Sequence, residues 1–408
     1  MFELREIQEQ KSTELKKVVR KNRIGILAGE VRSGKTLTVL ATAEKLRKKH
    51  VLFITKKKAI SSILSDYKLG SFSYKLTLIN YESIHKAETK GVDLVVCDES
   101  HTMGAFPKPS KRTKAVRDIV ATNKIDLILA SGTIHPESIA QIFHQLWVSY
   151  FTPFKSVNFY SWAKTYVDIF TMKINGFDVK QYNRTHDDLI QEKIKHLKVT
   201  MTQSDAGFTS KVFENFEVVE LKPITYKLIK KLKTDLVVEG KTEVVLADTA
   251  VKLQQKLHQL YSGTIKFESG NRAVIDPTKA EHIANKWKGQ KIAIFYKFVA
   301  ELDAIKSVYG DAITTDLEEF NATGKSYAGQ IVSSREGVNL SKADVLVFYN
   351  IDFSAVSYFQ ARDRLTTKER AENNVFWIFS KGGIESAIYK AVSKKKDFTL
   401  NVFKQFLK

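Results

Sequence analysis

A glycine-rich segment near the start of the chain carries the residue types that bind the phosphates of a nucleotide. Residues 29–36, GEVRSGKT, fit the pattern G-x-x-x-x-G-K-[ST]. Apolar residues 24–28 precede the segment and residues 36–49 follow at helical spacing, so we expect a loop that leads from a strand to a helix N-terminus. Backbone N–H groups and the helix dipole favour an anion there. The expected phosphate-binding residues are Gly29, Ser33, Gly34, Lys35 and Thr36.

Within this set, Lys35 is expected to contact the β- and γ-phosphates of ATP, and Thr36 to ligate Mg²⁺. An ordinary glycine turn that caps a helix is the alternative. The strand, the loop, the Lys-Thr pair and the helix together disfavour it.

An acidic pair supplies what nucleotide hydrolysis needs in addition. The largely apolar segment 92–97 is followed directly by Asp98 and Glu99. At the end of a strand, Asp98 is placed to hold magnesium through water, and Glu99 to polarise the attacking water as a general base. Acidic pairs at strand ends also cap helices, and it is the upstream phosphate loop that favours catalysis here. Cys97, the single cysteine, is expected to be a buried apolar residue rather than a nucleophile.

A second Gly-Lys-Ser segment, residues 324–326, lacks the context of a phosphate loop. Glu319 stands five residues before Gly324, at a position where such a loop needs glycine. We therefore expect a surface turn at residues 324–326.

Short apolar segments that alternate with segments of helical period predict an α/β fold with two parallel β-sheets. The first set of expected strands comprises residues 24–28, 51–55, 76–80, 92–97 and 125–130. The second set comprises residues 291–296, 312–315, 330–333, 345–349 and 375–379. We expect a first lobe at residues 1–150, a mostly helical connecting region with the start of the second lobe at 151–274, and the rest of the second lobe at 275–408.

The composition restricts the class of protein and its partners. The 408 residues include 65 Lys and Arg against 45 Asp and Glu, a net charge of +20, which indicates a polyanionic partner, nucleic acid first and a membrane surface second. One cysteine excludes a disulfide-stapled scaffold and a multi-thiolate zinc site, and the nine histidines lack metal-ligand spacing. With no secretory leader and no apolar run of about 18 residues, the chain is expected to be soluble and intracellular, without membrane association.

In their order along the chain, these motifs resemble those of superfamily 2 helicases, the nucleic-acid-dependent ATPases with two RecA-like lobes. Residues 4–8, LREIQ, look like the adenine-reading element, with Gln8 as the base contact. Residues 98–101, DESH, look like the DExH box. Ser131 and Thr133 look like the two named residues of the Ser-x-Thr coupling motif. The resemblance implies ATP and Mg²⁺ as cofactors and two RecA-like lobes.

Two segments of the second half extend the resemblance. Residues 333–340, SSREGVNL, resemble motif V, in which Gly337 is assigned to coupling. Residues 360–364, QARDR, resemble motif VI, in which Gln360 is assigned to ATP binding. The sequence patterns GxNL and QAxDR, together with NYE at residues 80–82, are most similar to those of the Snf2-like branch of DNA translocases and of compact phage or viral helicases.

Motif VI also implies an arginine that stabilises charge on the γ-phosphate. Arg364 is the first choice for this catalytic and ATP-binding role. The Snf2-type motif carries another arginine three residues later, where this chain has Thr367. Arg362 and Arg370 therefore remain alternatives.

The resemblance further implies contacts with the sugar–phosphate backbone of nucleic acid. Such contacts carry little sequence information and weaken with salt, so no sequence specificity is expected. The expected contact residues are Thr55, Lys56, Lys57, Lys58, Asn80, Tyr81, Tyr296, Lys297, Ser333 and Ser334. The aromatic side chains of residues 143–170 are expected to pack helices rather than to separate strands.

These observations predict an ATP-dependent DNA helicase or translocase that acts on forked or branched DNA in replication, recombination or repair, in a bacterium or a virus-infected cell. The choice of DNA rests on the Snf2-like resemblance alone, so an RNA helicase is the closest alternative. Another alternative is a nucleotide-regulated clamp that binds DNA without productive stepping. It is supported by Thr367, which stands where the Snf2-type motif has an arginine. A small-molecule kinase would explain the phosphate loop but not the net charge.

Overall fold

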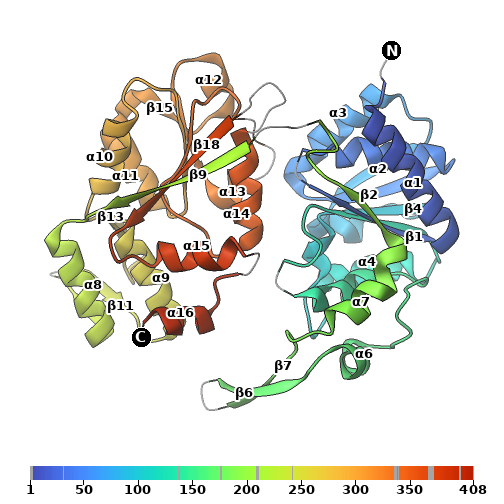
Figure 1. The fold of residues 1–408 in the computed structure, drawn as a ribbon, viewed down its shortest axis with the longest axis horizontal. Helices are drawn as coiled ribbons and strands as arrows, with labels where there is room; N and C mark the ends of the chain where they lie inside the picture. Colours follow the sequence, from blue (N-terminus) through green and yellow to red (C-terminus); the bar gives the residue numbers. More distant parts are fainter. Residues whose placement is uncertain are drawn as a thin grey trace. The chain divides into compact units, whose positions relative to one another are not determined.

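The computed structural model describes residues 3–30, 32–136, 138–174, 177–207, 211–240, 242–334, 338, 340–365, 372–394 and 397–407. The chain divides into two units, Met1–Phe208 and Thr209–Lys408. Each unit is built around a six-stranded sheet with helices packed against it (Figure 1). The expected α/β fold with two parallel sheets is therefore confirmed.

The first sheet has the strand order β3-β2-β4-β5-β1-β8, and its strands pair in parallel. The strands are β1 (Ile24–Gly29), β2 (His50–Thr55), β3 (Lys75–Asn80), β4 (Leu94–Asp98), β5 (Asp126–Ser131) and β8 (Lys198–Met201). Successive side chains point to opposite faces, so Ile26 and Leu27 of β1 join separate hydrophobic clusters. Because both faces are covered, these strands are apolar along most of their length. The five strands expected in this part are present.

Helices cover both faces of the first sheet. One face packs against α1 (Glu6–Asn22), α2 (Lys35–Lys45) and α3 (Ile60–Gly70). The other packs against α4 (Lys111–Val120), α5 (Ile142–Trp147), α6 (Phe159–Tyr166) and α7 (Asp187–Ile194). Short 3₁₀ helices are η1 (Lys57–Ala59), η2 (Tyr81–Lys86), η3 (Ser100–Met103), η4 (Ile139–Gln141) and η5 (Lys195–Leu197). A hairpin of β6 (Phe170–Ile174) and β7 (Phe177–Gln181) lies between α6 and α7 in the chain.

The aromatic residues after α5 pack as expected. Phe154, Phe159 and Trp162 are buried in the same cluster as Phe143, and the ring centroids of Phe143 and Trp162 lie 5.3 Å apart. Cys97 is likewise fully buried among apolar side chains. These residues stabilise the first unit and leave its chemistry to the polar side chains at the strand ends.

The second sheet has the order β15-β16-β14-β17-β18-β9, again with parallel pairs. Its strands are β9 (Lys211–Val219), β14 (Ala293–Tyr296), β15 (Ile313–Thr314), β16 (Ser326–Gln330), β17 (Leu346–Phe348) and β18 (Glu372–Ser380). Phe295 and Phe348 pack on one face, and Ile294 and Val347 on the other. Each face is therefore covered, as in the first unit.

The remaining elements of the second unit surround this sheet. Its helices are α8 (Pro223–Asp235), α9 (Ala250–Tyr261), α10 (Thr278–Lys286), α11 (Val299–Tyr309), α12 (Leu317–Ala322), α13 (Ile331–Ser334), α14 (Ala355–Arg362), α15 (Glu385–Val392) and α16 (Leu400–Phe406). Two 3₁₀ helices are η6 (Gly310–Ala312) and η7 (Asp363–Leu365). Two hairpins join β10 (Val237–Glu239) to β11 (Val244–Leu246) and β12 (Thr264–Lys266) to β13 (Arg272–Val274).

One expected strand lies at a different place. The strand β16 is formed by residues 326–330, SYAGQ, so that only the first of the expected residues 330–333 belongs to it and the others lie in α13. Small residues are needed there, because a Cβ atom on Gly329 would lie 2.6 Å from Oγ of Ser334 and 2.6 Å from Cε1 of Tyr327. The close packing of this strand removes the apolar run by which strands are recognised in a sequence.

The segment 151–274, expected as a mostly helical connecting region with the start of the second lobe, is divided between the two units. Its first part completes the first unit, since β8 pairs with β1, and its later part opens the second unit, since β9 pairs with β18. The division at Phe208 therefore coincides with neither expected boundary, 150 or 275. Edge strands have one open side, and β9 exposes Phe216 and Val218, so its sequence lacks the pattern of a buried strand.

Candidate functional site

The candidate site lies at the carboxyl ends of neighbouring strands in the first sheet. The loop after β1 leads to α2, whose N-cap residue is Gly34, with φ +98°. A Cβ atom on Gly29 would lie 2.4 Å from Cγ of Lys35, and one on Gly34 would lie 2.2 Å from Nη2 of Arg5. A side chain at either position would displace Lys35 or Arg5, and the left-handed backbone of Gly34 favours glycine there. Val31, inside the loop, lies outside the described residues.

Lys35 is at the centre of this arrangement. Its Nζ donates a hydrogen bond to the carbonyl oxygen of Glu30, at 2.9 Å. A Cβ atom on Gly132, just after β5, would lie 3.8 Å from the same Nζ. The positive charge of this ammonium group favours the ionised forms of Asp98 and Glu99, and it is one of several influences on their pKa values. The structure thus brings together the lysine of the loop, the acidic pair and the segment after β5.

Asp98 ends β4 and is held by two neighbours. Oγ1 of Thr55, the last residue of β2, donates to Oδ2 of Asp98 at 2.8 Å, and the hydroxyl of Tyr81 donates to the carbonyl oxygen of Asp98 at 2.7 Å. Burial and the carboxylate of Glu99 raise the pKa of Asp98 to about 6, while Thr55 and Lys35 oppose that rise. A carboxylate in this setting gains much from a cation beside it.

Glu99 follows in a left-handed backbone conformation, with φ +49°. Its Oε2 lies 3.2 Å from Nδ1 of His101. Burial opposes ionisation of Glu99, but His101 and Lys35 favour it and lower its pKa to about 2. Glu99 is therefore the more acidic carboxylate of the pair, and it is ionised, as a general base must be.

His101 links the acidic pair to the segment after β5. Its Nδ1 lies 3.0 Å from Oγ of Ser131, and that oxygen donates to the carbonyl oxygen of Thr133 at 2.9 Å. Both neighbours of Nδ1 are acceptors, because Glu99 is ionised and Ser131 gives its proton to Thr133. The proton of a neutral His101 is therefore on Nδ1. The two expected coupling residues, Ser131 and Thr133, are thus joined to the acidic motif by hydrogen bonds.

Gln8 and Arg5 hold the loop from the N-terminal side. Nε2 of Gln8 donates to the carbonyl oxygen of Gly34 at 3.3 Å, and Nη2 of Arg5 donates to that of Ser33 at 3.0 Å. Gln8 is buried, and its Oε1 accepts from the backbone N–H of Arg5. Arg5 was not among the expected site residues, although it lies in the same motif as Gln8 and its guanidinium donates to the carbonyl oxygens of Ser33 and Ala206.

The residues present fit a nucleoside triphosphate with Mg²⁺. Gly29, Gly34 and Gly132 surround Lys35 without side chains, which leaves space for phosphate oxygens. Oxygen donors suit Mg²⁺, and the hydroxyl of Thr36 with the carboxylate of Asp98 would hold it. Groups of three or more His, Cys, Asp or Glu with metal-binding geometry are absent from the part of the chain that the structure describes.

The expected nucleic-acid contacts of the first unit divide into two groups. Thr55 and Tyr81 are buried and bonded to Asp98, so their side chains serve the acidic site. Oδ1 of Asn80 accepts from the backbone N–H of Ser83 and caps η2. Lys57 and Lys58 are exposed and Lys56 is half-buried.

The nucleic-acid contact residues expected in the second unit differ in their exposure and in their partners. Tyr296 and Ser334 are buried, and Oγ of Ser334 lies 3.3 Å from the hydroxyl of Tyr327. Ser333 is exposed, and Lys297 forms an ion pair with Asp352. Gly337 lies outside the described residues.

The motif VI residues form a buried cluster at the end of α14. Nε of Arg364 donates to the carbonyl oxygen of Gln360 at 3.0 Å, and both side chains are mostly buried. Nη1 of Arg362 donates to Oε1 of Glu214 at 3.0 Å, which gives this arginine a partner within its own unit. Thr367 and Arg370 lie outside the described residues.

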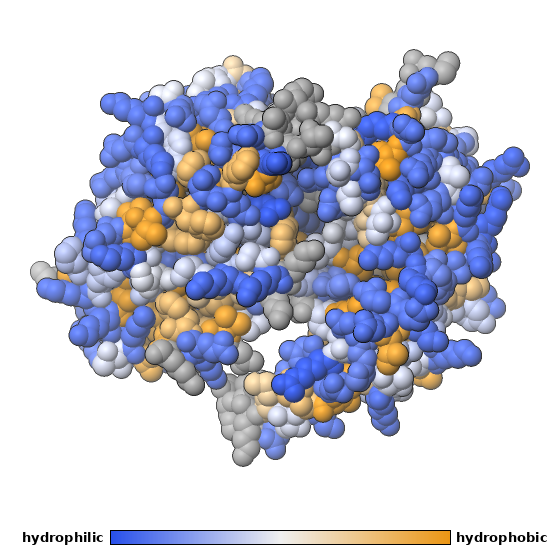
Figure 2. Space-filling view, viewed as in Figure 1, coloured by the Kyte–Doolittle hydropathy of each residue, from blue (hydrophilic) through white to orange (hydrophobic). Residues whose placement is uncertain are grey.

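Hydrophilic side chains cover most of the face seen in Figure 2, with apolar ones scattered among them. Within the described ranges, none of the helices combines the length and the apolar character needed to cross a bilayer.

Comparisons with known proteins give similarity to solved structures, while the two sequence comparisons find no match. No protein-family model matches the chain, and no curated protein sequence matches it. Among solved structures, the chain is similar to a Sulfolobus solfataricus SWI2/SNF2 ATPase core in complex with dsDNA. The two are 16% identical, the match covers 99% of this chain and 92% of the other, and the TM-score is 0.43.

Proposed function

We propose that this protein is an ATP hydrolase stimulated by nucleic acid, and that it acts as a translocase or helicase on DNA with forked or branched structure. The observation that carries the proposal is the convergence of Lys35, Asp98 and Glu99 at the ends of β1 and β4. A phosphate-binding loop alone binds nucleotides, whereas a cation site and an ionised general base beside it are the means of hydrolysis.

In this proposal each residue of the first unit has a defined task. Lys35 neutralises charge on the β- and γ-phosphates, and Thr36 and Asp98 hold the Mg²⁺ that shields those phosphates. Glu99 takes the proton of the attacking water, since its carboxylate is ionised. Ser131 ties Glu99 and His101 to the segment after β5, so a change at the γ-phosphate is passed to that segment.

The second unit would supply an arginine to the γ-phosphate during turnover. We assign this role to Arg364, the first choice from the resemblance to motif VI, with Arg362 and Arg370 as the alternatives. Binding and loss of the γ-phosphate then changes how the two units hold a strand, which converts hydrolysis into movement.

Nucleic acid is proposed as the partner because of the net charge of +20 and the exposed Lys57 and Lys58 beside β2. Lysine contacts with phosphates depend on salt and not on base sequence. DNA binding should therefore weaken with moderate salt equally for all sequences.

An ATPase assay tests this function. Single-stranded DNA, duplex, fork, four-way junction and RNA are compared as stimulants, and a DNA helicase or translocase is expected to respond most to a DNA structure. Lys35→Ala and Glu99→Gln should abolish the stimulated turnover, while Arg364→Ala should keep ATP binding and lose hydrolysis. Lys325→Ala is the matched control, since Lys325 also follows a glycine but pairs with Glu319 on the surface.

The outcomes separate the alternatives. Strongest stimulation by RNA would make the chain an RNA helicase, and tight DNA binding with little turnover in wild type would make it a nucleotide-regulated clamp. Normal turnover in Glu99→Gln would overturn the assignment of the general base.

A further inference from the structure

An ion pair at the carboxyl edge of the second sheet is not accounted for by the motifs. The neighbouring strands β14 and β17 continue in opposite directions, β14 to β15 and β17 to β18. In parallel α/β sheets the crevice at such a divergence is where ligands bind. Lys297 follows β14 and Asp352 follows β17, and Nζ of Lys297 donates to Oδ1 of Asp352.

This pair connects directly to helix α14. The side chains of Lys297 and Asp352 are only 15% and 12% exposed. The second carboxylate oxygen of Asp352 accepts from Oγ of Ser357, in α14, at 2.6 Å. The same helix carries Gln360, whose carbonyl oxygen accepts from Nε of Arg364. A single carboxylate therefore joins Lys297 to the helix of motif VI.

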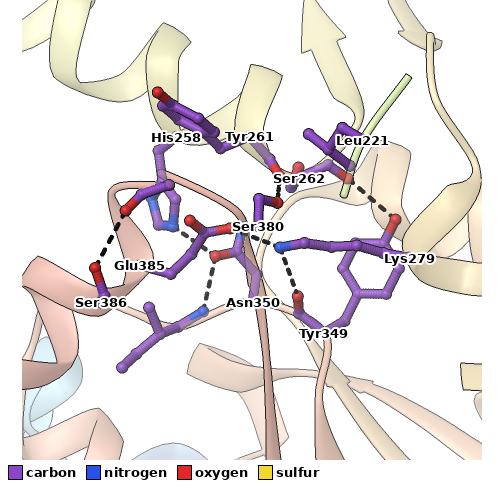
Figure 3. Close-up of polar contacts among 12 residues, drawn as sticks. Leu221, His258, Tyr261, Ser262, Lys279, Tyr349, Asn350, Ser380, Glu385 and Ser386 are labelled. Atoms are coloured by element: carbon purple, nitrogen blue, oxygen red, sulfur yellow. Dashed lines mark hydrogen bonds and ion pairs between the residues drawn. The ribbon is translucent and has the colours of Figure 1, made fainter. Parts of the chain in front are cut away.

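The backbone before Asp352 is firmly held. Oδ1 of Asn350 accepts from Nε2 of His258 at 2.5 Å and from the backbone N–H of Ile351, and Nδ2 of Asn350 donates to Glu301 at 2.6 Å. Figure 3 shows Asn350 beside the fully buried pair of Lys279 and Glu385, which lie 2.6 Å apart. Because this side is anchored, a change at Asp352 is transmitted forward to α14 more readily than back into the sheet.

Lys297 also lines a pocket of about 250 Å³. Two other cations, Lys266 and Arg272, share its wall, together with the amide side chains of Gln259 and Gln330. Nε2 of Gln330, at the end of β16, donates to the carbonyl oxygen of Lys297 at 3.0 Å. Cations and amides are the groups that contact the phosphates of a nucleic-acid strand.

We propose that Lys297 and Asp352 form a switch by which a nucleic-acid phosphate in this pocket acts on α14 and its arginine. The inference rests on the proposed function and deepens it. Without a strand, Asp352 holds Lys297. A phosphate draws Lys297 toward the pocket, and the carboxylate, which is costly to leave buried without its cation, rearranges with Ser357. Asp352 is thus a positioning residue for Arg364.

The first test is the stimulation ratio, the kcat with DNA divided by the kcat without it. Asp352→Asn should lower this ratio at least about fivefold, the lower range of allosteric coupling, with the KM for ATP within about twofold of wild type. Asp303→Asn is the matched control, since Asp303 pairs with Arg272 at the same pocket but lies on α11, and it should keep the ratio. Ser357→Ala, a milder change, should lower the ratio without weakening DNA binding. A wild-type ratio in both Asp352→Asn and Ser357→Ala overturns the switch.

The second test does not depend on hydrolysis. The ring of Trp377 stacks on that of Tyr358, in α14, with centroids 5.3 Å apart, so its fluorescence reports on the helix. DNA should change the emission of Trp377, obtained as the difference between wild type and Trp377→Phe, and the change should be absent in Asp352→Asn. DNA binding to wild type without this change overturns the switch and leaves the proposed function intact. A Trp377 response without stimulated hydrolysis overturns the proposed function instead.

Discussion

Replacing Thr55 by valine distinguishes a nucleic-acid contact from a residue that orients Asp98. The family resemblance implies that Thr55 contacts nucleic acid, whereas in the structure its side chain is fully buried and its hydroxyl donates to Oδ2 of Asp98 at 2.8 Å. Valine has nearly the same shape, so Thr55→Val removes the hydrogen bond and keeps the packing. The effect should therefore fall on the Mg²⁺ site.

The expected size follows from the contact. A hydrogen bond to a charged group contributes about 1.5–3 kcal/mol, and each 1.4 kcal/mol corresponds to about tenfold. Loss of a group that orients a metal ligand typically costs about 10–100-fold in metal affinity or activity. We expect the Mg²⁺ concentration for half-maximal ATPase activity to rise about tenfold in Thr55→Val.

The assay is an Mg²⁺ titration of ATP hydrolysis, paired with DNA binding measured by fluorescence anisotropy. Lys57→Ala is the matched control from the same segment, because Lys57 is exposed. It should weaken DNA binding and leave the Mg²⁺ dependence unchanged, the reverse of Thr55→Val. Weaker DNA binding with a normal Mg²⁺ titration in Thr55→Val would refute the reasoning.

Three further predictions concern stability and coupling. Glu385→Gln should destabilise the chain by about 3–5 kcal/mol in urea unfolding, because it leaves the buried ammonium of Lys279 unpaired, and Lys279→Met in the same chain should restore most of that loss. Burial lowers the pKa of His144 to about 4, so the unfolded chain, with a pKa near 6.5, binds the proton first. Stability should fall by about 3 kcal/mol between pH 6.5 and 4, and a fall of equal size in His144→Gln would contradict this. Ser131→Ala removes the hydrogen bond to His101 and should cost about 1 kcal/mol of stability. It should also lower the stimulation of ATP hydrolysis by DNA more than it weakens ATP binding, which ATPase assays and nucleotide titrations of wild type and variant check.

Much of the fold follows from patterns that act over a few residues. The buried strands β1, β2 and β4 are recognisable because parallel strands covered on both faces are apolar throughout. The edge strand β9 is not recognisable in this way, because its open side accepts polar as well as apolar residues. Strand β16 is not recognisable either, because the close packing at Gly329 interrupts its apolar pattern. The boundary between the two units could not be predicted from the sequence for a related reason, since it depends on which distant strand each edge strand pairs with.

The candidate site divides in the same way. Loop spacing and strand ends place Lys35, Asp98 and Glu99 together, because parallel strands of one sheet bring their carboxyl ends to the same edge. The partners of polar side chains are different. Thr55 and Tyr81 are among the residues for which the resemblance implies contact with nucleic acid, yet both bond to Asp98.

The amino-acid sequence by itself determined where the phosphate loop, the acidic pair and the alternating strands lie, since backbone conformation and hydrophobic period are properties of neighbouring residues. Only the tertiary structure decided which carboxylate of the acidic pair is the more acidic and which cation is paired with Asp352. Burial and charge pairing depend on residues that are far apart in the chain and are brought together by the sheet, so no local pattern contains them.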